Sequence, residues 1–490
     1  MSAMVCSMIR GTPLFSPFHF FLLSSNFRIG TVQFLIIVLY WNTDYPIGPV
    51  VRINPSELHV LDPSFYETLY VGSSVRPTDK WYWSARMFGP SAAAVGTADH
   101  DVHRHRRAAL NPFFSKKQIA QQEPRIQHHV DKLMGRLAGF RGTGKLVNLV
   151  DAFTALTADI IGDMAFGQSC NFLDKDDFNP EWHKFMMELS RNTHLMKQVP
   201  ALYSLLTILP RALVSLIHPI TRQLFALQDS IANSIRTAQD RYAEKQHPTH
   251  ENDGKWCMLD ALLSSPHLAP QDKHEHRLAE ESLTLLGAGT VTTAWTLSVI
   301  CYHVLANPRI RDTLQEELNA LPVSPTWNDY ENAPYLSAAV SEGLRLSHGT
   351  SHRLARISPH TALRLGSRVI PPGTPASMTQ MHLHLDASIF SCPDEFVPER
   401  WLSSLCGEEE VRERRKFLVP FSKGSRMCVG MNLAYAELFL TIGALFGPHG
   451  VMVDGGLTLH GTGARDVAVE RDWFNPVPFE GSKGVRILVT

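Results

Sequence analysis

The chain is poor in cysteine, and its cysteines follow no regular spacing. Seven are scattered over 490 residues, and no two lie two or three positions apart. This distribution excludes a zinc knuckle and a dithiol redox motif. A sparse, odd set in so long a chain is typical of reduced thiols in a reducing compartment.

An excess of charge of either sign is also missing. Lys plus Arg total 46 and Asp plus Glu 47, for a net charge of −1, so the chain has no general attraction to nucleic acid. Length alone suggests about three domains. No repeat and no low-complexity linker divides the sequence. A single, mainly α domain with a small β component is therefore a better prediction than three separate domains.

The amino terminus lacks a continuous run of apolar residues. PLFSPFHFFLLSS and VQFLIIVLYW are apolar, but Arg28 and several polar residues separate them. Neither run reaches the roughly 20 residues that span a bilayer. We interpret residues 1–45 as an atypical segment that serves as a membrane anchor or an interfacial segment. A wrongly assigned start codon is the alternative.

One internal stretch has no charged residue from Ser282 to Tyr302. By hydropathy alone it is a candidate membrane span. Its glycines, threonines and serines would make a poor lipid-facing surface. We therefore expect a helix that is buried on all sides in the core of a large domain.

A lone cysteine stands in a distinctive setting within LVPFSKGSRMCVGMNLAYAELF, residues 418–439. Cys428 precedes an amphipathic helix, whose N-terminal N–H groups can stabilise a thiolate. Gly424 and Gly430 allow the close backbone approach that aims N–H groups at the sulfur. Arg426 can pair with a carboxylate of a bound ligand. Together these features describe a single axial thiolate on a haem iron; the alternative is an inert cysteine beside a turn.

With Phe421, which can shield the sulfur from water, these residues resemble the haem-binding loop of the cytochrome P-450 family in spacing and identity. The resemblance extends over roughly residues 48–490. It implies one haem-thiolate monooxygenase domain over residues 46–490. In that fold haem b lies between the long central helix and the helix that follows the cysteine loop, with Cys428 as the iron ligand.

Two further motifs follow in the order of the family. SEGLR supplies Glu342 and Arg345, which share a helix face because they lie three residues apart, and FVPERW supplies Arg400. One carboxylate between two guanidinium groups can be buried, since each charge has a partner. The resemblance implies that this trio locks the core around the haem loop.

The resemblance also assigns residues to the haem propionates. His103 and Arg107 lie one helical turn apart in HDVHRHRRAALNPFF, and Arg356 lies in SHRLARIS. All three are expected to contact a propionate, as is Arg426. His382 and His384 are interpreted as structural, and no second metal is expected.

The oxygen-activation motif of the family corresponds to Ala288, Gly289 and Thr292 within the charge-free stretch. Gly287 and Gly289 should leave room against a flat ligand. The Thr292 hydroxyl can bond to the carbonyl four residues back and bend the helix, which makes a groove for dioxygen and water. The family usually has an acid before this threonine, but this chain has Val291. Proton delivery and coupling are therefore expected to be weakened, and Val291→Asp is expected to restore coupling.

The chain is most similar to fungal microsomal members of secondary metabolism, the trichodiene oxygenase-like group. This implies insertion of one oxygen atom from O2 into a small apolar terpenoid or polyketide, with electrons from an NADPH-dependent reductase. One alternative is a haem-thiolate isomerase or dehydratase that needs no reductase. A second is a catalytically impaired haem-binding copy.

The expected location is the cytosolic face of the endoplasmic reticulum membrane, or the soluble cytoplasm if the amino terminus is truncated. The basic tract EVRERRKF, residues 410–417, and Lys423 suit an acidic reductase partner by electrostatic steering. A solvated charged loop is the alternative for this tract.

Overall fold

The structure is a computed structural model that describes residues 49–88, 92–199, 208–217, 220–244, 256–448, 450–451 and 456–490. The segment 1–45, expected to be an anchor, lies outside the described residues.

The α-helices described are α4 (Tyr66–Leu69), α5 (Tyr82–Ala85), α6 (His100–Leu110), α7 (Lys116–Gln121), α8 (Glu123–Ala138), α9 (Leu149–Phe166), α10 (Pro180–Gln198), α12 (Arg211–Ile217), α13 (Ile220–Ala243), α14 (Met258–Ser264), α15 (Glu275–Ala306), α16 (Pro308–Asn319), α17 (Trp327–Asn332), α18 (Pro334–Ser347), α19 (Gln380–His384), α20 (Ser403–Cys406), α21 (Glu408–Phe417) and α22 (Met431–Phe446). The 3-10 helices are η1 (Pro63–Phe65), η2 (Arg86–Phe88), η3 (Phe172–Asp174), η4 (Pro270–Asp272), η5 (Pro398–Trp401), η6 (Gly424–Arg426) and η7 (Ala464–Asp466). The strands are β1 (Val50–Arg52), β2 (Leu58–Val60), β3 (Asp79–Lys80), β4 (Val147–Asn148), β5 (Arg356–Ile357), β6 (Leu363–Leu365), β7 (Arg368–Ile370), β8 (Ala376–Ser377), β9 (Leu457–Leu459), β10 (Arg471–Trp473), β11 (Asn475–Val477) and β12 (Arg486–Val489).

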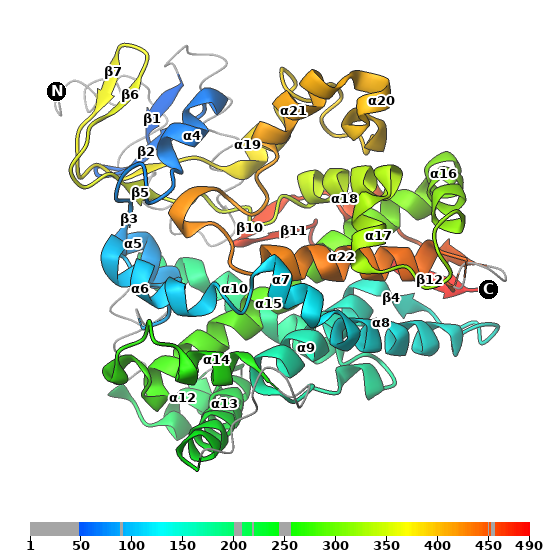
Figure 1. The fold of residues 1–490 in the computed structure, drawn as a ribbon, viewed down its shortest axis with the longest axis horizontal. Coiled ribbons are helices and arrows are strands. Elements are labelled where there is room, and N and C mark those ends of the chain that lie inside the picture. Colours follow the sequence, from blue (N-terminus) through cyan, green and yellow to red (C-terminus); the bar gives the residue numbers. More distant parts are fainter. Residues whose placement is uncertain are drawn as a thin grey trace.

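Helices make up most of the molecule, while β1, β2, β3, β5 and the β6-β7 pair lie at one side (Figure 1). The largest sheet has the order β1-β2-β8-β5-β3, in which only β2 and β8 run parallel. It is built from strands within residues 50–80 and residues 356–377. The prediction of a mainly α fold with a small β component is confirmed.

The charge-free stretch lies within α15, which runs through the helical core. This helix packs against α9, α13, α18 and α22, and most of its residues are buried. It is the one helix of the described residues that is long and apolar enough to cross a membrane, but 61% of its apolar window is buried inside the protein. The expectation of a buried core helix is confirmed. Near its start, Arg277 and Glu281 form a buried ion pair at 2.8 Å.

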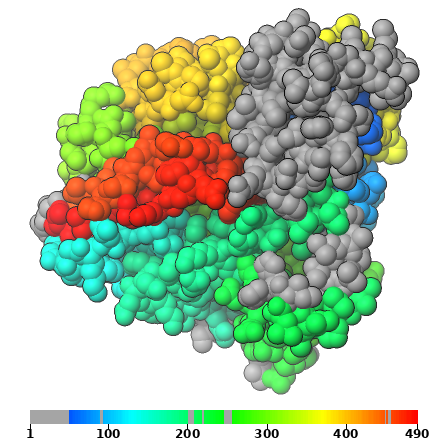
Figure 2. Space-filling view, turned by 180° about the vertical axis from the view of Figure 1, so that it is seen from behind, coloured from blue at the N-terminus to red at the C-terminus, as the bar shows by residue number. Residues whose placement is uncertain are grey.

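The C-terminal segments close the fold. Figure 2 shows them, in red and orange, lying between the chain near residues 350–400 and the helices of residues 110–190. β12 pairs with both β4 and β9, so the last strand is held to an early part of the chain. α22, which follows the cysteine loop, packs against α8, α15 and α18.

The predicted network around Glu342 is confirmed, and it is fully buried. The two carboxylate oxygens accept hydrogen bonds from Arg345 at 2.9 and 2.7 Å, and one also accepts from Arg400 at 3.0 Å. Trp401, which the sequence did not single out, donates its indole N–H to Glu342 at 2.9 Å. Because every donor meets the same carboxylate, α18 and η5 are locked together.

We expect Trp401→Phe to lower the free energy of unfolding by about 1.5–3 kcal/mol through the loss of a hydrogen bond to a buried charge. Trp327→Phe is the matched control, since Trp327 is also buried but its indole nitrogen has no partner among the described residues. Thermal or urea unfolding of the two variants measures the difference. Equal losses would mean that the Trp401 hydrogen bond contributes nothing.

Candidate active site

The cysteine loop places the Cys428 sulfur at the start of α22. The Cys428 N–H donates to the carbonyl of Phe421 at 2.9 Å, which closes the loop. The Cys428 residue is accessible to solvent, yet the protein around the sulfur is dense enough that burial raises the pKa of its thiol. The residue is thus open to solvent on one side and surrounded by protein on the others. The Gly430 N–H and Arg107 act in the opposite direction and favour the thiolate.

The two glycines of the loop have different functions. Gly424 has φ +77°, and a Cβ there would lie 2.3 Å from the carbonyl oxygen of Val71, so this position requires glycine. Gly430 has a negative φ of −84°, and a Cβ there would meet no protein atom within 4 Å. The expected close approach is therefore found at Gly424. Gly430 contributes its N–H to the sulfur instead.

Five basic side chains lie near one another beside this loop. They are Lys80, His103, Arg107, Arg356 and Arg426. Four of them were expected from the sequence. Lys80 was missed because the neighbour that identifies it is 276 positions away: β3 pairs with β5 so that Lys80 lies opposite Arg356. No local pattern around Lys80 signals this contact.

The backbone holds the guanidinium groups in place. Arg426 donates to the carbonyls of Thr78, Thr97, Ala98 and Asp99 at 3.1, 2.6, 2.6 and 3.2 Å. Arg107 Nη1 donates to the carbonyl of Met427, next to the cysteine, at 2.9 Å. These bonds aim fixed positive charge at the loop without neutralising it.

The charges of this cluster repel one another. Burial, then Arg356 and Arg426, hold the pKa of Lys80 well below its usual range. Burial, then Arg356, lowers the pKa of Arg426 to about 9, and burial together with the same cations lowers that of His103 to about 2. Buried like charges without an anion are costly. A ligand with two carboxylates removes that cost, so the residues present fit haem and its propionates.

The oxygen-motif region of α15 has the geometry expected of it at Thr292. The Thr292 hydroxyl donates to the carbonyl of Ala288, four residues back, at 2.8 Å. Ala288 is exposed and Thr292 is partly exposed, although both flanking stretches of α15 are largely buried. These two residues therefore face an accessible space inside the protein.

Gly289 does not share that face. A Cβ at Gly289 would lie 3.0 Å from the Ile161 side chain of α9. The expectation that Gly289 leaves room for a flat ligand is therefore wrong, since its small size allows the close packing of α15 on α9. The Thr157 hydroxyl of α9 adds a hydrogen bond of 2.6 Å to the carbonyl of Thr290 at this crossing.

Val291 is buried in an apolar cluster with Phe185 and Met186 of α10. An aspartate placed among these apolar side chains would be partly desolvated, which would raise its pKa. The effect of Val291→Asp on coupling stays a prediction.

A buried acid contacts Thr293, the residue after Thr292, and no local sequence pattern predicted it. Glu437 of α22 is 1% exposed, and burial raises its pKa to about 8, while a hydrogen bond from Thr293 lowers it. One of its carboxyl oxygens has no partner among the described residues. Glu437 is therefore mostly protonated near neutral pH. Its hydrogen-bond partner, Thr293, directly follows Thr292 of the oxygen motif.

Two other expectations concern charged and histidine residues outside the site. The basic residues of α21 are not free. Arg412, Arg414 and Lys416 each pair with a glutamate of the same helix, so the predicted positive surface is largely neutralised. His384 accepts a hydrogen bond from the Val419 N–H at 3.0 Å, which agrees with a structural function.

Comparison with known proteins identifies relatives over most of the chain. The tryptophan 6-hydroxylase of Fusarium equiseti is 40% identical over 446 residues, 90% of this chain and 84% of the relative. The N-acetyltryptophan 6-hydroxylase of Emericella nidulans is 41% identical over 445 residues, 89% of this chain and 84% of the relative. The fusicoccadiene C-8 hydroxylase of Phomopsis amygdali is 36% identical over 454 residues, 90% of this chain and 84% of the relative.

The family model described as Cytochrome P450 matches residues 45–448. This span contains the thiol at the start of α22, the buried cation cluster and the oxygen motif. Members of the family bind haem b through a cysteine thiolate and use O2 with electrons that come from NADPH through a reductase. The chain therefore belongs to the cytochrome P450 family and is a haem-thiolate monooxygenase like its fungal relatives of secondary metabolism.

Proposed function

We propose that this enzyme hydroxylates a largely apolar secondary metabolite at a haem held by Cys428, with electrons from an NADPH-dependent reductase. The observation that carries the proposal is an accessible sulfur at the N-terminus of α22 beside a buried cluster of cations. Neither feature is stable alone, because the thiol is partly desolvated and the cations repel one another. A haem with two propionates satisfies both requirements.

Each residue of the site has a defined task in this proposal. Cys428 would ligate the haem iron, and the hydrogen bond with the Gly430 N–H favours its thiolate. Lys80, Arg107, Arg356 and Arg426 hold the propionates, and His103 stays neutral and donates a hydrogen bond. When bound, the haem supplies O–O bond cleavage, which the thiolate promotes by donating electron density.

Proton supply is assigned to Thr292 and Glu437. The Thr292 hydroxyl is held on the Ala288 carbonyl at 2.8 Å and lies on the accessible face of α15. Glu437 carries a proton near neutral pH and contacts the neighbouring Thr293. A route from α22 compensates for the apolar Val291, so the chain does not need the usual acid.

The relatives favour two substrate types. One relative is named for fusicoccadiene, by its name a diene, and this is compatible with the terpenoid or polyketide expected from the sequence. Two are named for tryptophan and N-acetyltryptophan, which supports an aromatic amino-acid derivative as a second candidate. Reductase-dependent NADPH consumption coupled to product separates hydroxylation from rearrangement without a reductase.

We further propose that residues 46–490 form one domain and that residues 1–45 attach it to the cytosolic face of the endoplasmic reticulum. The family match, which begins at residue 45, supports the boundary. It leaves the first 44 residues free for attachment.

The first experiment is the carbon-monoxide difference spectrum of the reduced protein. The wild type and Cys406→Ser, a control at a partly exposed cysteine, are expected to show the strongly red-shifted Soret band of a thiolate-ligated haem. Cys428→Ser should lose that band while binding haem less tightly. A red-shifted band that survives Cys428→Ser would overturn the assignment of the ligand.

Lys80→Met tests the cation cluster. We expect the apoprotein to become more stable by about 1 kcal/mol, since one repelling charge is removed. We expect haem to dissociate about tenfold faster from the variant, which corresponds to about 1.4 kcal/mol. Unfolding of the apoprotein and transfer of haem to apomyoglobin measure the two effects. Lys117→Met, at an exposed lysine, is the control. The proposal would be contradicted if Lys80→Met made the apoprotein less stable and also weakened haem binding.

Glu437→Gln tests the proton route and has a separate structural readout. Because the folded pKa is raised to about 8, the wild type binds a proton that the unfolded chain releases above about pH 4.5. Its stability should therefore fall as pH rises from about 4.5 to 8, and the variant should gain on it by at least about 1 kcal/mol between pH 6 and 9. Product formed per NADPH should fall several-fold. An unchanged coupling ratio would remove Glu437 from the route.

A further inference from the structure

A second cluster of buried polar side chains lies at the end of α10. Lys197 Nζ is 3.2 Å from His352 Nε2, and His352 Nδ1 is 3.0 Å from a carboxylate oxygen of Asp472. All three side chains are buried. They come from α10, from the segment that leads into β5, and from β10, so only the fold brings them together.

The hydrogen bonds fix the tautomer of His352. Burial, and then Lys197, lower the pKa of His352 to about 3, so the ring is neutral. Asp472 is a carboxylate that also accepts from the Ser351 hydroxyl and the Phe474 N–H, both at 2.8 Å. His352 therefore donates Nδ1–H to Asp472, and its Nε2 accepts from Lys197. This arrangement fixes the direction of the lysine.

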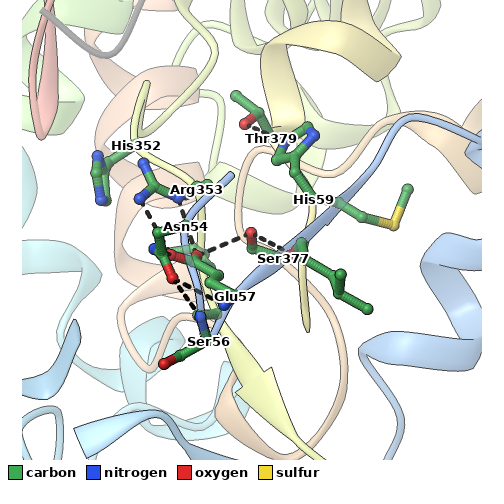
Figure 3. A network of polar contacts seen from close by, with 12 residues as sticks. Asn54, Ser56, Glu57, His59, His352, Arg353, Ser377 and Thr379 are labelled. Carbon is green, nitrogen blue, oxygen red and sulfur yellow. Dashed lines mark hydrogen bonds and ion pairs between the residues drawn. The ribbon is translucent and has the colours of Figure 1, made fainter. Parts of the chain in front are cut away.

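Lys197 is the member of the cluster without a carboxylate of its own. The Glu57 carboxylate accepts hydrogen bonds from Arg353 at 2.9 and 3.1 Å and from the Ser377 hydroxyl at 3.0 Å (Figure 3). Among the described residues, no acidic oxygen lies within ion-pair distance of Lys197, and one of its three N–H donors is used. Burial, and then Arg353, lower the pKa of its ammonium to about 7, although the more distant Glu57 and Asp472 act to raise it. Donors of Lys197 are therefore left for a bound anion.

A metal ion is a poor occupant of this place. His194, His352 and Asp472 offer three ligand atoms within 4.8 Å of one another. However, the Lys197 ammonium lies against the same imidazole and would repel a cation. The Asp472 oxygens are already engaged by a hydroxyl, a backbone N–H and the histidine. An anion placed on Lys197 meets none of these objections.

The cluster borders a cavity that also reaches the cation cluster. His352 lines a cavity together with the apolar side chains of Met87, Phe88 and Phe474 and with Arg356 of the cation cluster. The other half of α10 packs against Val291, next to Thr292, through Phe185 and Met186. α10 thus connects Lys197 to the oxygen-motif region. Lys197 lies about 16 Å from Met186 along the helix axis.

We propose that Lys197, oriented by His352 and Asp472, binds a carboxylate of the substrate while its apolar part lies against Phe88 and Phe474. The substrate class is an apolar or aromatic carboxylic acid. This inference rests on the proposed hydroxylase function and makes it more specific. It distinguishes the two substrate candidates, since a terpene hydrocarbon has no group for Lys197 to bind.

The test uses the full-length holoenzyme and pairs of phenylalkanoic acids and their primary amides, from phenylacetic to phenylhexanoic acid. Dissociation constants come from the Soret shift on binding. We expect at least one acid to bind about tenfold or more tightly than its amide. Lys197→Met should bring the acid-to-amide ratio close to one and leave amide binding unchanged. Lys197→Arg should keep part of the preference.

Lys184→Met is the matched control, because Lys184 lies on the same helix but is exposed and paired with Glu181. It should leave the ratio unchanged. If no acid in the series outbinds its amide in wild-type protein, or if Lys197→Met keeps the preference, the proposal is wrong. Should Lys197→Met fail to fold, His352→Gln and Lys197→Arg decide it, since both must reduce the preference.

The two proposals fail in different ways. A normal carbon-monoxide spectrum with no preference for acids removes the carboxylate site and leaves the haem-thiolate function intact. A missing red-shifted band removes the haem assignment before any substrate is added.

Discussion

The buried carboxylate of Glu342 is the constraint on which the position of the haem loop depends. Arg345 satisfies it and then extends the network, since its Nη1 donates to the carbonyl of His384 at 2.8 Å. His384 in turn accepts from the Val419 N–H at 3.0 Å, in the loop that leads to Cys428. A charge on α18 is thereby linked through hydrogen bonds to the segment that positions the thiolate. Removal of the Glu342 carboxylate would leave Arg345 and Arg400 unpaired in the core, and an unpaired buried charge typically costs about 3–5 kcal/mol.

Two other groups of buried charge are not balanced in this way. The cations around Arg426 repel one another, and no carboxylate of the described residues lies within ion-pair distance of Lys197. A protein tolerates such an arrangement when a ligand supplies the missing charge, and strongly shifted pKa values therefore concentrate at functional sites. The charge of Glu342 is balanced within the protein. Under the proposed function, the charges of the cation cluster and of Lys197 are balanced by bound molecules.

Local spacing was enough to predict the parts of the site that lie on one element. The Cys428 loop, the pair Glu342 and Arg345, and the Thr292 hydroxyl bond each depend on residues within a few positions of one another. Trp401, Lys80 and Glu437 could not be found in this way, because their partners lie far away in sequence. Lys80 meets Arg356 only through the register of β3 and β5. The error at Gly289 has the same origin, since its face is decided by the crossing of α9.

The exchange of an acid for Val291 also has a consequence for α10. An acid at position 291 would stand against Phe185 and Met186, which offer no donor, so α10 and Val291 are matched as an apolar pair. Lys197, the buried lysine of α10, lies eleven residues further along the helix than Met186. Under the proposed function, proton supply falls to Glu437 of α22 and substrate binding to Lys197 of α10. The two tasks would then be carried by different helices that pack against α15, and neither would need the acid that the family usually carries.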